Sequence, residues 1–457
     1  MKEPAPDFSR PGPARLTILG GGIAGLAVAH HAEKLGLDYA LLEANARLGG
    51  NCITLEHDGF RFDSGAHRLH NKAPGVTREL GRLLGDRLRP VARPSKFFDN
   101  GRFVDHPVSA FNLLRVLGPA LAARAAVEIA ISRLRPARPC SSYEEFAVGR
   151  YGRAMAERYL LPFTSKIWNV PCGRLVPEVA AKRFQEFGAR ALFGQLLGRR
   201  QGPGPGHQWA YFYPEGGIGA IAAALAAGCR PGALRTSAAV TAVEHAGGRI
   251  RRVTAGGASL AVDEVVSTLP LDVLVGSLHP APPPEIAAAA GRIRYRAVLL
   301  AAFFLDRPAV TGAATLYFAD PAYAVSRVYE PRNRDEGMAP PGKTSLVAEI
   351  PCSNGDAAWA LPDGEIVRLA RSDLVRAGLL AEREIIGSRV HRMPHAYPVM
   401  ETGMVREAGR ILDYLGGFAN LKLAGRSACY RYLWMHELIA AAGELAAGYA
   451  APPAGGS

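Results

Sequence analysis

The sequence has few of the features that mark secreted or disulfide-stapled proteins. None of its six cysteines stands in a C-x-x-C pair, so they predict free thiols in a reducing compartment. Residues 1–14 are proline-rich and polar, and they lack the apolar core of a signal peptide. We therefore expect a flexible N-terminal tail, a second short tail over 451–457, and a cytoplasmic protein.

Long apolar runs are also missing. Segment 111–134 is rich in Ala and Leu, but Arg115, Arg124, Glu128 and Arg133 interrupt it and make a membrane-spanning helix unfavourable. The pattern predicts an amphipathic helix on the flank of the fold, and weak association with a membrane surface is the alternative.

Acidic residues are in deficit, since the sequence has 54 Lys and Arg but only 41 Asp and Glu, and its formal net charge is +13. No block of like charge and no nucleic-acid motif accompanies this excess, so we expect no nucleic-acid partner. An anionic cofactor and a small anionic or sugar-linked substrate fit the charge better. His67 and His70 are three residues apart, but no carboxylate or cysteine stands at partner spacing, and we expect no metal.

The most informative stretch lies near the N-terminus. An apolar run at 16–19 leads into Gly20, Gly22 and Gly25 in G-x-G-x-x-G spacing, followed by an alanine-rich helical stretch and a second apolar run that ends at Glu43. This order of strand, turn, helix and strand predicts a dinucleotide site, with phosphates at the helix N-terminus and Glu43 on a ribose hydroxyl.

The residues after this stretch separate FAD from NAD. Glu43, Arg47, Gly49 and Gly50 form an E-x-x-x-R-x-G-G extension that resembles the FAD-binding amine oxidase superfamily, which includes protoporphyrinogen oxidase and UDP-galactopyranose mutase. The resemblance implies FAD as the cofactor, with the arginine near its phosphates. The FAD-binding residues that it implies are Gly20, Gly22, Ile23, Ala24, Gly25, Glu43, Ala44, Arg47, Gly49, Gly50, Gly65, Ala66, His67, Val240, Gly425, Arg426 and Met435.

Two further motifs resemble the mutases. The G-A-H segment at 65–67 implies a histidine beside the flavin ring, and the terminal Gly425-Arg426 motif, followed by a helix from about Met435, implies a helix N-terminus that faces the ring. Tyr430, Tyr432, Met435 and His436 also match the mutase pattern. Leu433, Trp434 and Asn169 depart from it, since the mutases carry Tyr, Asp and Gly there.

A separate set of residues is expected at the substrate. In the mutases and in bacterial protoporphyrinogen oxidase-like proteins, a segment similar to 163–168, followed by a pair similar to Lys182-Arg183, lines the substrate cleft. The resemblance, together with the affinity of aromatic faces for rings and of guanidinium for phosphate, implies contacts from Phe163, Trp168, Arg183, Arg327, Tyr430, Tyr432 and Trp434. The alternative is that the aromatic residues belong to the core and the basic residues to the surface.

The expected fold is α/β, a Rossmann-type FAD-binding domain assembled from discontinuous segments plus a mixed α+β substrate domain with a helical insertion. The FAD-binding segments would be 15–71, 207–290 and 395–450. Residues 72–206 would form the mostly helical insertion, and 291–394 would form the sheet of the substrate domain.

Three functions follow from this reading. The first is an FAD-dependent oxidoreductase in which flavin N5 takes a hydride from a polar, sugar-type or nucleotide-linked substrate, with His67, Arg327 and Arg426 as the catalytic candidates. The alternative is a redox-neutral pyranose/furanose mutase that uses reduced FAD. The third is a non-catalytic flavoprotein or membrane-surface carrier. The oligomeric state is not predicted by any pattern in the sequence.

Overall fold

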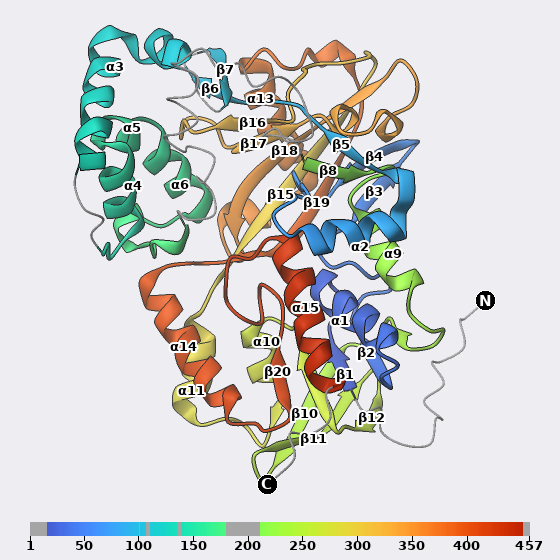
Figure 1. Ribbon diagram of the computed structural model, residues 1–457. Helices are drawn as coiled ribbons and strands as arrows, with labels where there is room; N and C mark the ends of the chain where they lie inside the picture. The colour runs from blue at the N-terminus through green and yellow to red at the C-terminus, as the bar shows by residue number, and fades with distance from the viewer. Residues whose placement is uncertain (1–15, 100, 107–109, 135–138, 180–210, 451–457) are drawn as a thin grey trace.

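The computed structural model describes residues 16–99, 101–106, 110–134, 139–179 and 211–450. Within these ranges helices and strands are mixed along the chain. The strands form two main sheets, one in the lower and one in the upper half of the view (Figure 1). The two expected tails, Lys182 and Arg183 lie outside the described residues. No helix in the described ranges is long and apolar enough to cross a membrane.

The lower sheet is fully parallel. Its strands lie in the order β20 (Leu421–Leu423), β13 (Glu264–Ser267), β1 (Leu16–Leu19), β2 (Tyr39–Leu42) and β9 (Leu234–Arg235). The central strand β1 is buried throughout, and all its residues except Thr17 are apolar, because helices cover the sheet. Over it pack α1 (Ile23–Lys34), α9 (Gly219–Ala227), α15 (Met435–Ala450) and α2 (Pro74–Leu84) (Figure 1). The strands expected at 16–19 and before Glu43 are confirmed.

A smaller sheet extends this half of the molecule. Its order is β12 (Ala258–Ala261), β11 (Arg249–Ala255), β10 (Val240–Ala246) and β14 (Leu278–His279), and Gly247-Gly248 closes the hairpin between β10 and β11. A second core cluster joins this sheet and the parallel sheet to α10 (Leu271–Gly276), α11 (Pro284–Arg292) and α14 (Thr402–Gly416).

The upper sheet has seven strands. Their order is β19 (Ile385–Pro398), β15 (Tyr295–Leu305), β18 (Thr344–Ser353), β17 (Arg327–Tyr329), β16 (Thr315–Phe318), β6 (Ser95–Asp99) and β7 (Arg102–His106). Every residue of β15 is buried, including Arg296. The helices α12 (Ala357–Ala360) and α13 (Asp363–Arg376) pack against this sheet.

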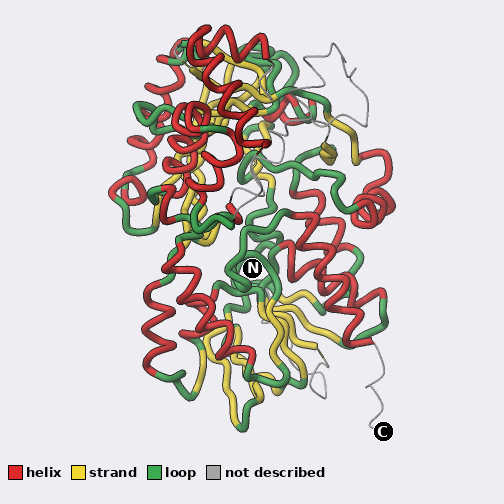
Figure 2. The backbone as a smooth tube through the Cα atoms, turned by 60° about the vertical axis from the view of Figure 1, so that its left-hand side comes forward, coloured by secondary structure: helices red, strands yellow, loops and turns green. Residues whose placement is uncertain are grey.

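The described part of segment 72–206, which the sequence predicts to be mostly helical, contains helices and three short strands. Four helices gather beside the upper sheet, namely α3 (Ala110–Leu134), α4 (Tyr143–Tyr151), α5 (Arg153–Met155) and α6 (Leu161–Trp168) (Figure 1, Figure 2). However, β6 and β7 complete the upper sheet, and β5 (Leu88–Val91) pairs with β8 (Tyr211–Pro214). The partners of β5 and β6 lie far along the chain, and a local apolar pattern does not reveal such pairing.

A short hairpin leads from the lower half to the upper half. It consists of β3 (Thr54–His57) and β4 (Phe60–Asp63), and residues 64–68 follow it directly. Because β4 is packed against the core and its last residue is fully buried, this hairpin fixes where the next residues emerge.

Candidate functional site

A cavity of about 330 Å³ lies between the parallel sheet and the seven-stranded sheet. Its walls come from the start of α1, the turn after β4, strands β6, β16, β17 and β19, helix α6 and the segment before α15. Ligands of α/β sheets bind beyond the carboxyl ends of the strands, where this cavity lies. Its larger polar and aromatic side chains are His67, Arg68, His70, Phe97, Phe163, Tyr317, Arg327, His395, Tyr397, Arg426, Tyr432 and Trp434.

The glycine turn after β1 leaves open space at one end of the cavity. Gly20 has φ +100°, and a Cβ on Gly25 would lie 2.0 Å from the Gly20 carbonyl oxygen, so these two glycines shape the turn and its packing on α1. A Cβ on Gly22 would meet only the Cα of Gly50, 3.9 Å away. Gly22, Ile23 and Ala24 line the cavity, so the positive end of the α1 dipole points toward it.

Glu43, directly after β2, is buried beneath this turn. Its Oε2 accepts a hydrogen bond from the Gly21 amide at 2.6 Å, and its Oε1 accepts two from Asn45, from the amide at 2.8 Å and from Nδ2 at 2.6 Å. The carboxylate therefore ties the glycine turn to the chain after β2. Each oxygen has about two lone pairs, so Oε2 retains capacity for a ligand hydroxyl.

The turn after β4 brings His67 to the cavity. The His67 Nε2 lies 3.3 Å from Ser64 Oγ, and Ser64 Oγ donates to the carbonyl of Asn51 at 2.6 Å. Asn51 follows the Gly49-Gly50 pair, whose turn meets Gly22 through a backbone bridge. The segments that carry the glycine pair and the histidine therefore border the same end of the cavity.

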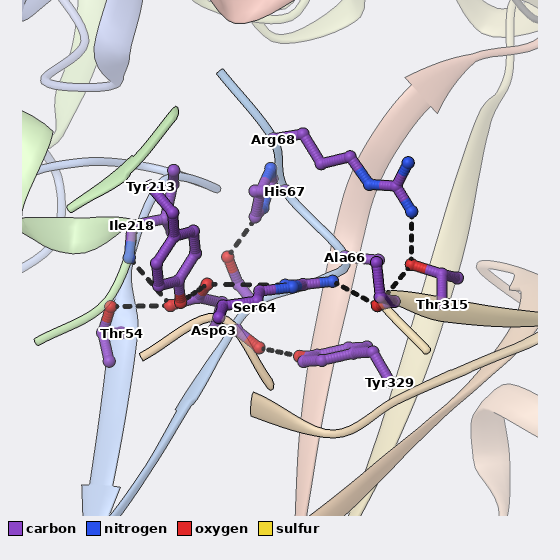
Figure 3. A network of polar contacts seen from close by, with 12 residues as sticks. Thr54, Asp63, Ser64, Ala66, His67, Arg68, Tyr213, Ile218, Thr315 and Tyr329 are labelled. Atoms are coloured by element: carbon purple, nitrogen blue, oxygen red, sulfur yellow. Dashed lines mark hydrogen bonds and ion pairs between the residues drawn. The ribbon is translucent and has the colours of Figure 1, made fainter. Parts of the chain in front are cut away.

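A fully buried carboxylate holds this turn from behind (Figure 3). The Asp63 side chain accepts hydrogen bonds from three groups, Thr54 Oγ1 at 2.8 Å, Tyr213 OH at 2.5 Å and the Ile218 amide at 3.0 Å. Its backbone carbonyl accepts a bond from Tyr329 OH at 2.6 Å. Burial raises the pKa of Asp63, and the Arg334 guanidinium 3.8 Å away opposes that rise. Asp63 thus joins β4 to β3, β8, β17 and the start of α9.

Enclosure by the protein keeps His67 neutral. Burial, followed by the nearby charges of Arg426, Arg334 and Arg327, lowers the pKa of His67 to about 3. The unfolded chain protonates this imidazole near its ordinary pKa of about 6.5, so the unfolded state binds more protons between these two values. Stability from His67 is therefore fully present above about pH 6.5 and is lost as the pH falls toward 3.

We expect His67→Gln to reduce the acid sensitivity of the fold. The wild-type free energy of unfolding should fall by up to ~1.4 kcal/mol per pH unit through this group below about pH 6.5. Urea unfolding at about pH 7 and about pH 5 measures the difference for wild type and variant. The control His279→Gln removes an exposed imidazole. An equal loss of stability on acidification in wild type and His67→Gln would contradict a neutral, partly buried His67.

Arg327 reaches the cavity from β17 and is held by a buried carboxylate on β18. Its Nε donates to Glu349 Oε2 at 2.6 Å, its Nη2 also pairs with Glu349, and Nη2 donates to Tyr397 OH at 2.9 Å. Burial opposes the charge, but Glu349 and neighbouring tyrosines raise the pKa of Arg327 above its ordinary value. The other oxygen of Glu349 accepts from the Ala66 amide at 2.8 Å. One carboxylate therefore positions both Arg327 and the turn that carries His67.

Arg426 ties the segment before α15 to β19. Its Nε and Nη2 donate to the Leu433 carbonyl at 3.0 and 2.6 Å, and Nη1 donates to the Ala396 carbonyl at 3.0 Å. Its guanidinium carbon lies 5.4 Å from the centre of the Tyr432 ring. Arg426 thus borders the cavity as expected, but its donors bind backbone carbonyls that shape the wall.

The expected substrate residues fall into three groups. Phe163, Arg327, Tyr432 and Trp434 line the cavity. Trp168 and Tyr430 lie behind its wall. Trp168 is fully buried with its ring against Tyr397 and Tyr432, and Tyr430 OH bonds the carbonyls of Arg294 and Val399 at 2.8 and 3.1 Å. Substrate contact of Trp168 and Tyr430 therefore stays a prediction that the lining of this cavity does not support, while Arg183 lies outside the described residues.

The expected cofactor residues divide in a similar way. Gly22, Ile23, Ala24, Gly65, Ala66, His67, Gly425, Arg426 and Met435 line the cavity. Val240 starts β10 and is half-buried away from it, so its expected adenine contact remains a prediction. Ala44 and Arg47 are exposed beyond β2.

Several cavity residues were missed from the sequence. Arg68, Phe97, Tyr317 and Tyr397 all line it. Arg68 directly follows the G-A-H segment, and that adjacency was a usable signal. Phe97 and Tyr317 lie on β6 and β16, whose parallel pairing joins segments far apart in the chain. No described group of three or more His, Cys, Asp or Glu side chains could hold a metal ion.

The residues at the glycine turn fit an FAD molecule. The open space above Gly22 is the cradle that a pyrophosphate needs, and the start of α1 supplies backbone amides to it. Gly50 comes so near that a Cβ there would lie 3.0 Å from Gly22 Cα, and its φ of +57° favours glycine. Glu43 lies beneath the same turn. The cavity beyond it would take the flavin ring beside His67 and the segment before α15.

Comparisons with known proteins agree with this geometry. The family model described as "Flavin containing amine oxidoreductase" matches residues 23–447. Protoporphyrinogen oxidase 1 of Arabidopsis thaliana is 31% identical over 174 residues, which cover 33% of this chain and 30% of that enzyme. Coproporphyrinogen III oxidase of Bacillus subtilis is 22% identical over 79% of this chain and 83% of its own length.

Among solved structures, reduced UDP-galactopyranose mutase superposes with a TM-score of 0.80 and 20% sequence identity over 95% of this chain and 94% of the mutase. At that identity the likeness shows a shared fold. The family match spans nearly the whole described chain and includes every segment around the cavity. The chain therefore belongs to the flavin-containing amine oxidoreductase family and is an FAD-dependent enzyme of the amine oxidase-like oxidoreductase class.

Proposed function

We propose that the enzyme oxidises a polar, anionic substrate of the sugar or nucleotide-sugar type. The charge of the cavity carries this proposal. None of the described residues that line the cavity is Asp or Glu, whereas three of them are arginines. Arg327 is neutralised by Glu349, but Arg68 and Arg426 contact no carboxylate within the described part of the chain. Such a cavity attracts anions and disfavours ammonium groups, despite the family name.

The roles of the chain follow from its geometry. FAD, when bound, supplies the hydride acceptor at N5 of its ring. The aromatic rings of Phe163, Tyr432 and Trp434 offer flat faces for a sugar or a base. His67, neutral at physiological pH, borders the ring site, and Arg327 is fixed in position for the substrate by Glu349. Orientation of the substrate within a site walled by rings is the main contribution of the protein.

We further propose that segments 15–71, 207–290 and 395–450 together hold FAD and that 72–206 and 291–394 hold the substrate. The cavity lining supports this division in part, because the glycine turn and residues 425–438 form one side of it and β16, β17 and α6 form the other.

The test is the anaerobic visible spectrum of the purified protein during addition of nucleotide sugars. We expect one compound to bleach the oxidised flavin band in a single turnover. The substrate then loses two electrons and two protons, its hydride passes to FAD, and the remaining proton passes to solvent, so no other oxidant is needed. Bleaching by putrescine or another amine, with none by any anionic compound, would refute the proposal.

A redox-neutral mutase is the second candidate. Tyr432 and Met435 of the mutase-like motif line the cavity, and the fold is that of a mutase. Trp434, where the mutases carry Asp, also lines it and counts against the same substrate. Absence of bleaching, followed by isomerisation of a nucleotide sugar only after chemical reduction of the flavin, would favour this candidate over the first.

A further inference from the structure

The segment directly after His67 presents basic side chains on one side. Leu69 exchanges backbone hydrogen bonds with Phe212, at 3.3 and 2.8 Å, and its side chain is fully buried in the core. In an extended chain, alternate residues face opposite sides. Arg68 and His70 therefore share the side opposite Leu69, and Lys72 lies in the turn that follows. We refer to residues 68–72 as the basic segment.

Two aromatic rings alternate with these basic groups. The Arg68 guanidinium carbon lies 5.1 Å from the centre of the Tyr211 ring, and the His70 ring lies 5.4 Å from that of Trp434. The Lys72 ammonium lies 4.0 Å above the Trp434 ring. Arg68, His70 and Trp434 line the cavity, while Lys72 is exposed. The basic segment thus runs from inside the cavity to the solvent.

The Arg68 guanidinium is fixed by hydrogen bonds to neutral hydroxyl groups, one of which is shown in Figure 3. Its Nη2 donates to Ser95 Oγ at 2.7 Å and to Thr315 Oγ1 at 2.8 Å. Thr315 Oγ1 donates to the Ala314 carbonyl at 2.8 Å, which also accepts from Arg334, the partner of Asp63. The buried network that fixes the His67 turn therefore also fixes Arg68.

Only one nitrogen of Arg68 is used in this way. Its Nε and Nη1 make no hydrogen bond within the described part of the chain, and its bonded partners there are neutral hydroxyls. A guanidinium that is held rigidly, has no carboxylate partner in the described part of the chain and lines a cavity is suited to bind an oxyanion. Arg327, by contrast, already has Glu349.

We propose that the basic segment is the phosphate-binding element of the substrate site. Arg68 binds a phosphate of the substrate inside the cavity, and Lys72, placed over Trp434, attracts the same group at the entrance. Arg68 lines the cavity and Lys72 lies at the exposed end of the basic segment, so the two residues act in sequence on one group. This inference rests on the proposed function and narrows its substrate to a phosphate-bearing compound.

The experiment titrates the FAD-loaded protein with UDP and with inorganic pyrophosphate, followed by the visible flavin spectrum and tryptophan fluorescence. We expect Arg68→Gln to raise the UDP dissociation constant by about tenfold or more and Arg68→Lys, which keeps the charge but not the fork, to raise it less. Lys72→Gln should weaken binding by about threefold and flatten its dependence on salt. The matched control Arg89→Gln removes an exposed arginine paired with Glu215 on the surface and should leave binding unchanged.

Unchanged UDP affinity in both Arg68 variants, with FAD still bound, would overturn the proposal. Equal displacement of UDP by a dicarboxylate would overturn the assignment to phosphate. If Arg68→Gln loses FAD or fails to fold, the UDP dissociation constants of Arg68→Lys and Lys72→Gln, each compared with wild type, test the proposal. The outcome is separable from that of the proposed function, because Arg68-dependent UDP binding without any flavin bleaching would support the phosphate element and overturn the oxidation.

Discussion

Gly22→Val is expected to abolish FAD binding while leaving the fold intact. A Cβ added at Gly22 meets no protein atom nearer than Gly50 Cα, 3.9 Å away, so we expect the apoprotein to accept the substitution. The branched methyl groups would occupy the space above the turn through which the pyrophosphate must approach the amides of α1. We expect a colourless protein with the circular dichroism and unfolding midpoint of the wild-type apoprotein.

Two controls separate loss of the cofactor from loss of the fold. Gly364→Val places the same side chain in the first turn of α13, where no atom lies within 4 Å, and should remain yellow. Gly25→Ala puts a Cβ 2.0 Å from the Gly20 carbonyl oxygen and should destabilise the fold itself. A yellow Gly22→Val protein with a normal flavin content would disprove the placement of FAD at this turn.

The sequence predicts the cofactor half of the site well because its determinants are local. Gly20, Gly22 and Gly25 stand within six residues of one another, and Glu43 directly follows the next strand. The close contact that requires Gly25, with the Gly20 carbonyl, lies within this single strand, turn and helix unit, so the spacing carries the information. The apolar runs of β1 and β15 are equally local signals of burial.

The substrate half is less predictable, because its residues come together only through long-range pairing. Phe97 reaches the cavity because β6 pairs with β16, and Arg327 is positioned by Glu349 on the neighbouring strand β18. Trp168 was expected at the substrate from a motif, but α6 turns its ring into the core. Which face of a helix meets a cavity depends on packing partners that no short motif contains.

The second large effect is expected at Glu349, a residue that no sequence motif marks. Its side chain is almost fully buried, and its two oxygens divide between Arg327 and the Ala66 amide. Removing one partner of a buried ion pair leaves the other charge uncompensated, which costs about 3–5 kcal/mol. Glu349→Ala should therefore lower the free energy of unfolding by about this amount, measured by urea denaturation.

A change at Glu349 should also lower the catalytic rate, independently of its effect on stability. Displacement of Arg327 and of the His67 turn by about 1 Å can lower the rate about a hundredfold, so Glu349→Gln should slow anaerobic flavin bleaching even where the protein stays folded and yellow. Glutamine can still accept from the Ala66 amide but no longer neutralises Arg327. If Glu349 acts through Arg327, flavin bleaching should be equally slow in Arg327→Met and in the double variant that combines Arg327→Met with Glu349→Gln. The second change then removes nothing further. Additive losses in this cycle would instead show that Glu349 acts independently of Arg327, and an unchanged bleaching rate in Glu349→Gln would remove its positioning role altogether.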